Sequence, residues 1–109
     1  MTELVYLALA FAFAIGCNIY DTVMSVKGIK AGVAVEANFT WLYGTDKPSA
    51  LQYYAVNIPI IFLASALSII GLFTHNPTLF YAGLAGPIVA GAKHIVGGRE
   101  WAALLTAKK

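Results

Sequence analysis

Long uncharged apolar runs alternate with short polar segments along the chain, and their lengths predict helices that cross a membrane. The three longest runs are residues 4–20, which continue with little charge to residue 26, residues 51–73, and residues 76–92, which Ile95 and Val96 extend. A bilayer core of roughly 30 Å requires about 20 helical residues. The third run meets this length if the Lys93 side chain reaches toward the interface. The pattern therefore predicts an all-α membrane helical bundle with three transmembrane helices.

A fourth apolar segment extends from Gly32 to Gly44. It has only 13 residues and contains Glu36 and Asn38. Because this is short for a span, we expect a short re-entrant or interfacial helix here, with a tilted fourth transmembrane helix as the alternative. In both cases residues 1–109 form a single integral membrane domain.

The basic residues predict the orientation of the chain. Three of them (Lys27, Lys30 and Lys47) lie between the first two runs, and four (Lys93, Arg99, Lys108 and Lys109) lie at or after the end of the third. Three spans place all seven on one side, whereas four spans would divide them. Because basic loops stay in the cytoplasm, we expect a multi-pass protein of the cell (inner) membrane with its N-terminus outside and its C-terminus in the cytoplasm. Aromatic residues near this side (Trp41, Tyr43, Tyr53, Tyr54 and Trp101) are expected to form an interfacial belt.

Composition supports a lipid environment. The chain is 60% hydrophobic and 11% charged, whereas soluble domains carry about 25% charged residues. The net charge of +2 is too small and too scattered for nucleic-acid binding. The expected surroundings are the lipid bilayer and either a second copy of the chain or a larger membrane complex.

The cysteine and histidine content argues against several kinds of chemistry. The single Cys17 excludes an internal disulfide and a multi-cysteine metal site. His75 and His94 are 19 residues apart, roughly 28 Å along a helix, so they could not share one haem. No Ser-His-Asp set, metal cluster or phosphate loop stands out, so we expect neither an enzyme nor a bound metal or cofactor. A cleaved lipoprotein signal ending before Cys17 is an alternative reading of residues 14–17, although the basic start of a signal peptide is replaced by Glu3.

Small residues recur at every fourth position on two of the predicted helices. They are Ala8, Ala12 and Gly16 on the first helix, and Gly83, Pro87 and Gly91 on the third. This spacing lets helix backbones approach closely in lipid, so both stripes are predicted to be helix-packing faces. Pro59 and Pro87 each free one backbone carbonyl and are expected to bend their helices.

Polar residues gather in the cytoplasmic half of the predicted helices. Four of them share one face of the first helix, at spacing i, i+3, i+4 and i+7: Asn18, Asp21, Thr22 and Ser25. The predicted intramembrane polar cluster contains seven residues: Asn18, Asp21, Glu36, Asn38, Asn57, Lys93 and His94. A charge near the bilayer centre costs about 2.5–3.5 kcal/mol, so we expect Asp21 to pair with Lys93 or His94. The alternative is that Asp21 lies among the headgroups beside Lys27.

Two short motifs carry a resemblance to a known family. Asp21-Thr22 is followed by residues 32–38, which read Gly-Val-Ala-Val-Glu-Ala-Asn. Together they resemble a family of small bacterial and archaeal membrane proteins, a domain of unknown function whose pattern is Asp, Thr, Gly and then Glu-x-Asn-Pro opening a further helix. Phe39 stands at the place of that proline, and Asn57 at the place of a lysine in the next helix. The resemblance covers about half of the chain and implies a small helical bundle, but no activity.

Two classes of function remain. The glycine faces and short loops favour a structural or accessory subunit that packs in a homo-oligomer or a larger membrane complex, and this is the first expectation. The polar cluster favours the alternative, a small oligomeric transporter, channel or proton-handling protein, because ionisable groups inside a membrane often mark ion pathways.

Overall fold

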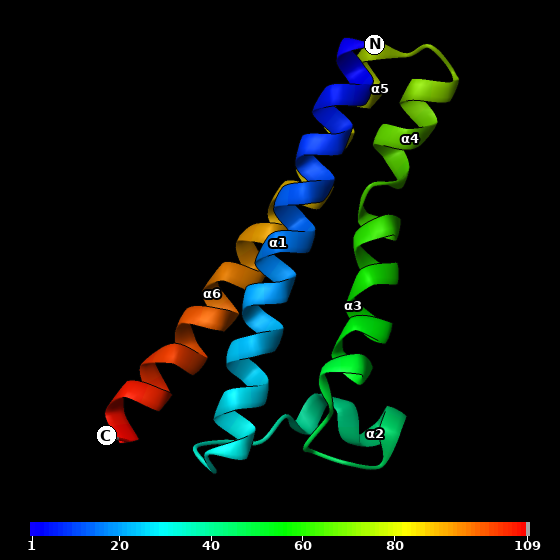
Figure 1. Cartoon of the computed structure of the whole chain (residues 1–109). Helices are drawn as coiled ribbons and strands as arrows, with labels where there is room; N and C mark the ends of the chain where they lie inside the picture. The colour runs from blue at the N-terminus through cyan, green and yellow to red at the C-terminus, as the bar shows by residue number, and fades with distance from the viewer. Residues whose placement is uncertain (109) are drawn as a thin grey trace.

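A computed structural model describes residues 1–108, which form helices and loops without a strand. Helix α1 (Thr2–Lys30) lies beside two broken helical stretches, α3 (Ala50–Ala64) with α4 (Ala66–Phe73), and α5 (Pro77–Gly83) with α6 (Ala85–Lys108). The stretches run along the long axis of a molecule that measures 50 × 28 × 16 Å. The N-terminus and the α4–α5 turn lie at one end of the bundle, and α2 and the C-terminal end of α6 lie at the other (Figure 1).

The helix lengths agree with the expectation of a membrane bundle. Thr2–Lys30 has 29 residues and Pro77–Lys108 has 32, and both are long and apolar enough to cross a membrane. The pair α3–α4, bent by 43°, makes a third such stretch if its two halves count as one span. The last helix is longer than the apolar pattern suggests, because α6 continues through the polar residues after position 92 to Lys108.

The segment from Gly32 to Gly44 contains no helix of spanning length. Its helical parts are only η1 (Ala37–Phe39) and α2 (Thr40–Tyr43). Both terminal glycines have positive φ, +73° at Gly32 and +67° at Gly44, a conformation that ends a helix. Neither a fourth span nor a continuous re-entrant helix is therefore formed. The segment lies as a loop across one end of the bundle (Figure 1). We call this end of the bundle the basic end, because four lysines lie near it: Lys27, Lys30, Lys47 and Lys108.

Both broken stretches are interrupted at specific residues. Ser65 separates α3 from α4 and donates its hydroxyl to the carbonyl of Ile61 at 2.9 Å, a bond that often bends helices. The bend therefore follows Ser65, whereas Pro59 lies within the continuous helix α3. The other break, at Leu84, precedes Pro87, which lacks the N–H group that would bond the carbonyl four residues earlier.

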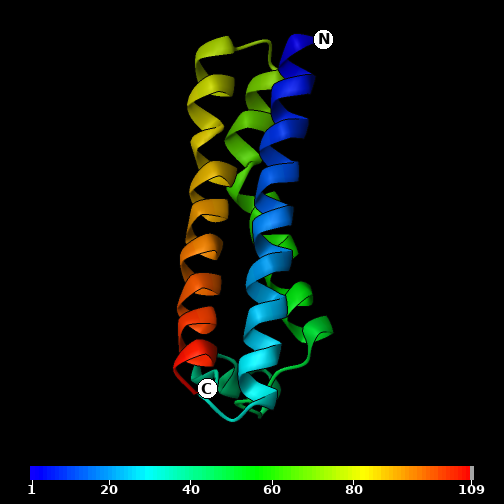
Figure 2. The same ribbon diagram turned by 60° about the vertical axis from the view of Figure 1, so that its left-hand side comes forward.

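Glycines bring α4 and α5 into direct backbone contact. A Cβ atom at Gly83 would lie 2.8 Å from the Cα of Ser68, and one at Gly71 would collide with the backbone of Phe80. Between these contacts the Ser68 hydroxyl donates to the carbonyl of Phe80 at 2.8 Å. The two helices thus form a tight hairpin, while α5 and α6 continue in nearly one line beside α1 (Figure 2).

Candidate functional site

The close packing of α1 on α6 positions the site. The buried face of α1 combines small residues with polar ones: Ala10, Ala14, Asn18, Thr22, Ser25 and Gly28. Glycines of α6 meet this face. Gly91 contacts Ala14, and Gly98 lies against the backbone of Asp21. Because the backbones approach so closely, the larger polar side chains between these contacts must meet one another.

A carboxylate and an imidazole form the centre of the site. Nδ1 of His94 lies 2.7 Å from Oδ2 of Asp21, and the two side chains are 14% and 20% exposed, respectively. The other ring nitrogen, Nε2, lies 3.4 Å from Nδ2 of the fully buried Asn18. A neutral ring with its proton on Nδ1 satisfies both contacts, since Nδ1–H donates to the carboxylate and Nε2 accepts from the amide. Gly97 leaves room for this carboxylate, because a Cβ there would lie only 3.1 Å from Oδ1.

The hydroxyl of Ser25 holds the Asp21 carboxylate from its other side. It donates to the Asp21 backbone carbonyl at 2.7 Å and lies 3.3 Å from the carboxylate oxygen Oδ1. Ser25 itself is only 2% exposed. The carboxylate is therefore flanked by His94 at Oδ2 and by the Ser25 hydroxyl near Oδ1.

A cavity of about 240 Å³ with several polar side chains in its wall opens beside this pair. Its charged and titratable lining residues are Asp21, Glu36, Tyr53, Lys93 and His94, and its neutral polar ones include Ser25, Asn38 and Asn57. The lining comes from α1, the loop after α1, α3 and α6. The cavity is thus the place where all the long elements of the basic end meet.

Glu36 forms a second carboxylate position across the cavity. The hydroxyl of Tyr53 donates to its Oε2 at 3.3 Å, and Asn38 lies 3.5 Å from Oε1. The loop is held in place because the Glu36 amide donates to the carbonyl of Asp46 at 2.7 Å. Removal from water raises the pKa of the Glu36 carboxyl above its ordinary value; the nearby Asp21 charge adds to this rise, while the Tyr53 and Asn38 hydrogen bonds oppose it.

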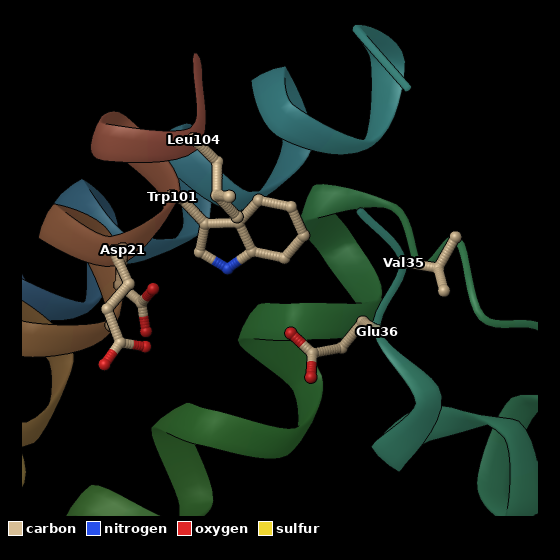
Figure 3. Close-up of a pocket in the computed structure, with 7 residues that line it drawn as sticks. Asp21, Val35, Glu36, Trp101 and Leu104 are labelled. Carbon is tan, nitrogen blue, oxygen red and sulfur yellow. The ribbon is translucent and has the colours of Figure 1, made fainter. Parts of the chain in front are cut away.

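A neighbouring cavity of about 320 Å³ shares Asp21 and Glu36 with the first. Trp101, Leu104 and Glu100 of α6 line its other walls. The indole of Trp101 projects between the Asp21 and Glu36 carboxylates, and Leu104 lies beside it (Figure 3). Trp101 reaches this place because Gly28 of α1 leaves space for the ring.

The structure brings the seven residues of the predicted polar cluster to this one region. Six of them line the 240 Å³ cavity, and the seventh, Asn18, contacts His94. Of the two bases considered for Asp21, His94 is the partner in the structure, whereas Lys93 is exposed and forms no ion pair with Asp21 or Glu36. Asn57 lines the cavity without a hydrogen bond across helices among the described residues.

The predicted packing stripes divide into two groups. On the last stretch, Gly83, Pro87 and Gly91 are all buried between helices. On α1, Ala8, Ala12 and Gly16 are exposed, and no atom lies within 4 Å of a Cβ placed at Gly16. The expectation for α1 is therefore wrong within one chain. Ala10 and Ala14 pack instead, because they continue the polar face of Asn18 toward the N-terminus in steps of four.

Residues outside the predicted cluster also contribute to the site: Ser25 and Trp101, described above, and Tyr53 and Gly97. Tyr53, expected in an interfacial belt, is 4% exposed and packs at right angles against Phe39, with ring centroids 5.1 Å apart. The capping box formed by Ser49 and Gln52 begins α3 one turn before Tyr53 and directs it to Glu36. Gly97 is identified only by its closeness to Asp21, and no pattern in the sequence signals this.

The chemistry available to the site is proton transfer and polar binding. It contains two carboxylates, one imidazole, one phenol and one ammonium group around a cavity. Among residues 1–108 no group of three or more His, Cys, Asp or Glu side chains is arranged to hold a metal ion. The pairing of Asp21 with His94 places one acid and one base at hydrogen-bond distance, the geometry that proton exchange requires.

Comparison with family models, with curated proteins and with solved structures finds no match to this chain. The resemblance carried by Asp21-Thr22 and residues 32–38 therefore stays a prediction. The conclusions about function depend on the geometry of the site alone.

Proposed function

We propose that this chain is a small proton-handling membrane protein of the transporter or channel class, which works through the cavity of about 240 Å³ at its basic end. The observation that carries the proposal is the 2.7 Å contact between Asp21 and His94 in the wall of that cavity. Both residues belong to helices that are long and apolar enough to cross a membrane. Ionisable groups in such helices are costly and often serve proton or ion pathways.

The surroundings of the pair support this function. Asp21 and His94 are not fully enclosed: their side chains retain 20% and 14% exposure, and the cavity beside them is large enough for several water molecules. Glu36 and Lys93 line the same space and supply further groups that can bind or release a proton. The cavity thus connects an acid–base pair within a candidate span to the end of the bundle.

The basic end is proposed to face the cytoplasm of a cell with an inner membrane, and the N-terminus to lie outside. The distribution of lysines supports this orientation, because Lys27, Lys30, Lys47 and Lys108 all lie near one end. A bundle of two or three spans has too few helices to surround a pore, so the protein is proposed to act as a homo-oligomer.

Proton flux into proteoliposomes tests the proposal. Liposomes with a trapped pH-sensitive dye and a potassium gradient develop a membrane potential when valinomycin is added. We expect wild-type protein to acidify the lumen faster than protein-free liposomes allow, and Asp21→Asn to reduce that flux at least tenfold. Glu3→Gln, a charge removal at the opposite end of α1, is the matched control and should retain the flux. Equal flux in wild type and Asp21→Asn, or none above the protein-free level, would refute the function.

An accessory subunit of a larger complex is the second candidate. The exposed small residues Ala8, Ala12 and Gly16 favour it, because such a stripe suits contact with another helix in lipid. Affinity purification from native membranes with mass spectrometry distinguishes the two. A large partner in stoichiometric amount would favour the subunit, whereas self-association alone favours the proton-handling oligomer.

A further inference from the structure

One fully buried side chain of the site has an unused hydrogen-bonding atom. Asn18 is 0% exposed, and its Oδ1 has no hydrogen-bond partner among residues 1–108, although its Nδ2 faces Nε2 of His94. Leaving a buried acceptor unpaired is unfavourable, and a leucine of similar size would avoid this cost if the position served only for packing. The unpaired oxygen therefore indicates a second state of the site in which it is used.

We propose that Asn18 is a positioning residue that allows His94 to exist in two protonation states, by turning its amide nitrogen toward the neutral ring and its amide oxygen toward the protonated ring. The inference rests on the proposed function in that it takes His94 as a group that holds the transferred proton. It adds Asn18 as the residue that gives His94 a hydrogen-bond partner in both its neutral and its protonated form.

A neutral ring with its proton on Nδ1 fits the distances in the structure. Nδ1–H of His94 donates to Oδ2 of Asp21, and Nε2 accepts from the Asn18 amide. In this state the donor at Nδ1 faces an acceptor, and the acceptor at Nε2 faces a donor. An added proton at Nε2 would meet the N–H of Asn18, so the arrangement has to change when the ring is protonated.

The protonated state needs only one torsional change. A hydronium ion in the cavity gives its proton to the ring, an N–H bond forms at Nε2, and a water molecule remains. A half-turn of the Asn18 amide about its last side-chain bond exchanges Nδ2 with Oδ1 without changing its shape, and this torsion has a broad, nearly two-fold profile in asparagine. Oδ1 then accepts from Nε2–H, so the atom that is unpaired in the neutral state becomes the partner of the charged ring.

The charged and titratable groups that face His94 come from three neighbouring elements and from α6 itself. Asp21 from α1 and Glu36 from the loop after α1 face the same cavity and supply negative charge, while Tyr53 from α3 is neutral. Lys93 precedes His94 on α6 and opposes the added charge, but it is exposed to solvent. Thr22, one turn beyond Asn18, is buried with an unpartnered hydroxyl and makes no hydrogen bond to His94.

Nitrogen NMR on protein in lipid nanodiscs tests the inference. In a His75→Gln background the single remaining histidine is His94, and ¹⁵N labelling of His and Asn side chains reports its ring and the Asn18 amide. We expect the neutral ring to carry its proton on Nδ1, and the Asn18 amide signal to move over the same pH range as the ring signals. Asn18→Leu should lower the ratio of protonated to neutral ring at fixed pH by roughly fivefold, since the lost hydrogen bond to the charged ring is stronger than the lost bond to the neutral ring.

Thr22→Val is the matched control, because it also removes a buried unpartnered oxygen from the same face of α1. It should leave the ratio unchanged. An Asn18 amide signal that stays constant while the ring titrates would overturn the inference, and this measurement needs no variant of Asn18 that might misfold. The NMR measurement does not depend on proton flux. Wild-type protein without flux above the protein-free level would refute the proposed function, whereas an Asn18 amide signal that does not change with pH would refute only the role of Asn18 at His94.

Discussion

Gly83 allows a direct test of how the bundle packs, because the same substitution can be made at an exposed glycine. Changing Gly83 to alanine places a Cβ atom 2.8 Å from the carbonyl carbon of Leu67 and the Cα of Ser68. These are backbone atoms, so no side chain can move aside and the two helices must separate. Separation also weakens the hydrogen bond from the Ser68 hydroxyl to the Phe80 carbonyl, now 2.8 Å long.

The expected loss follows from these two contacts. Overpacking of a filled interior costs about 1–3 kcal/mol, and an interhelical hydrogen bond in a membrane protein contributes about 0.6 kcal/mol on average. We therefore expect Gly83→Ala to lower the free energy of unfolding by about 1–3 kcal/mol. The assay is reversible unfolding by SDS from detergent micelles, followed by circular dichroism.

Gly16→Ala is the control for this experiment. Nothing lies within 4 Å of a Cβ at that position, so the unfolding free energy should change by no more than about 0.5 kcal/mol. Equal effects at the two glycines, or a Gly83→Ala protein as stable as wild type, would show that α4 and α5 do not form the close hairpin described above.

Three further predictions concern charge and topology. In a Cys17→Ala background, single cysteines at positions 47 and 108 should be labelled from the cytoplasm and one at position 76 from outside; labelling of 47 and 108 from opposite sides would exclude the proposed orientation. Asp21→Asn should lower the free energy of unfolding by about 1.5–3 kcal/mol, since His94 loses a charged hydrogen-bond partner. This loss should exceed that of the double variant Asp21→Leu with His94→Leu, in which neither partner is left unpaired. If the effects of the single variants simply add in the double variant, the two residues do not interact. The pKa of Glu36 is raised in the folded protein, so its contribution to stability is complete below the ordinary carboxyl pKa of 4.5 and is lost as pH rises through the folded pKa. Because glutamine resembles the neutral carboxyl, wild type and Glu36→Gln should be about equally stable at low pH in unfolding measurements, and wild type should become the less stable of the two as pH rises. A stability difference that does not change with pH would contradict the cause given.

The sequence predicted the helical membrane fold because run length and apolar composition are direct consequences of bilayer thickness. It predicted the breaks less well. Pro59 lies within a continuous helix, while the bend comes from Ser65, whose hydroxyl bonds its own helix. Of the two prolines, only Pro87 marks a break, the one at Leu84, and the other interruption is explained by the bond from the Ser65 hydroxyl.

The polar cluster was predictable from depth, since residues near the same ends of packed helices must meet. The choice of His94 over Lys93 as partner of Asp21 was not, because adjacent residues on a helix point in directions about 100° apart, and only the rotation of α6 against α1 decides between them. The correct packing stripe of α1 could have been found by extending the polar face in steps of four, from Asn18 to Ala14 and Ala10. The place of Tyr53 in the site could not have been predicted from the sequence, because the direction of its side chain depends on the start of α3 at Ser49 and on the loop that carries Glu36.

The central claim is that Asp21 and His94 act as one proton-binding unit. Proton flux into proteoliposomes, measured for Asp21→Asn, for His94→Gln and for the double variant, tests it most directly, because residues that act as a unit are not additive. We predict that each single variant loses at least tenfold in flux and that the double variant is no slower than the worse single one. A double variant whose loss equals the product of the two single losses, or a single variant with wild-type flux, would contradict the claim.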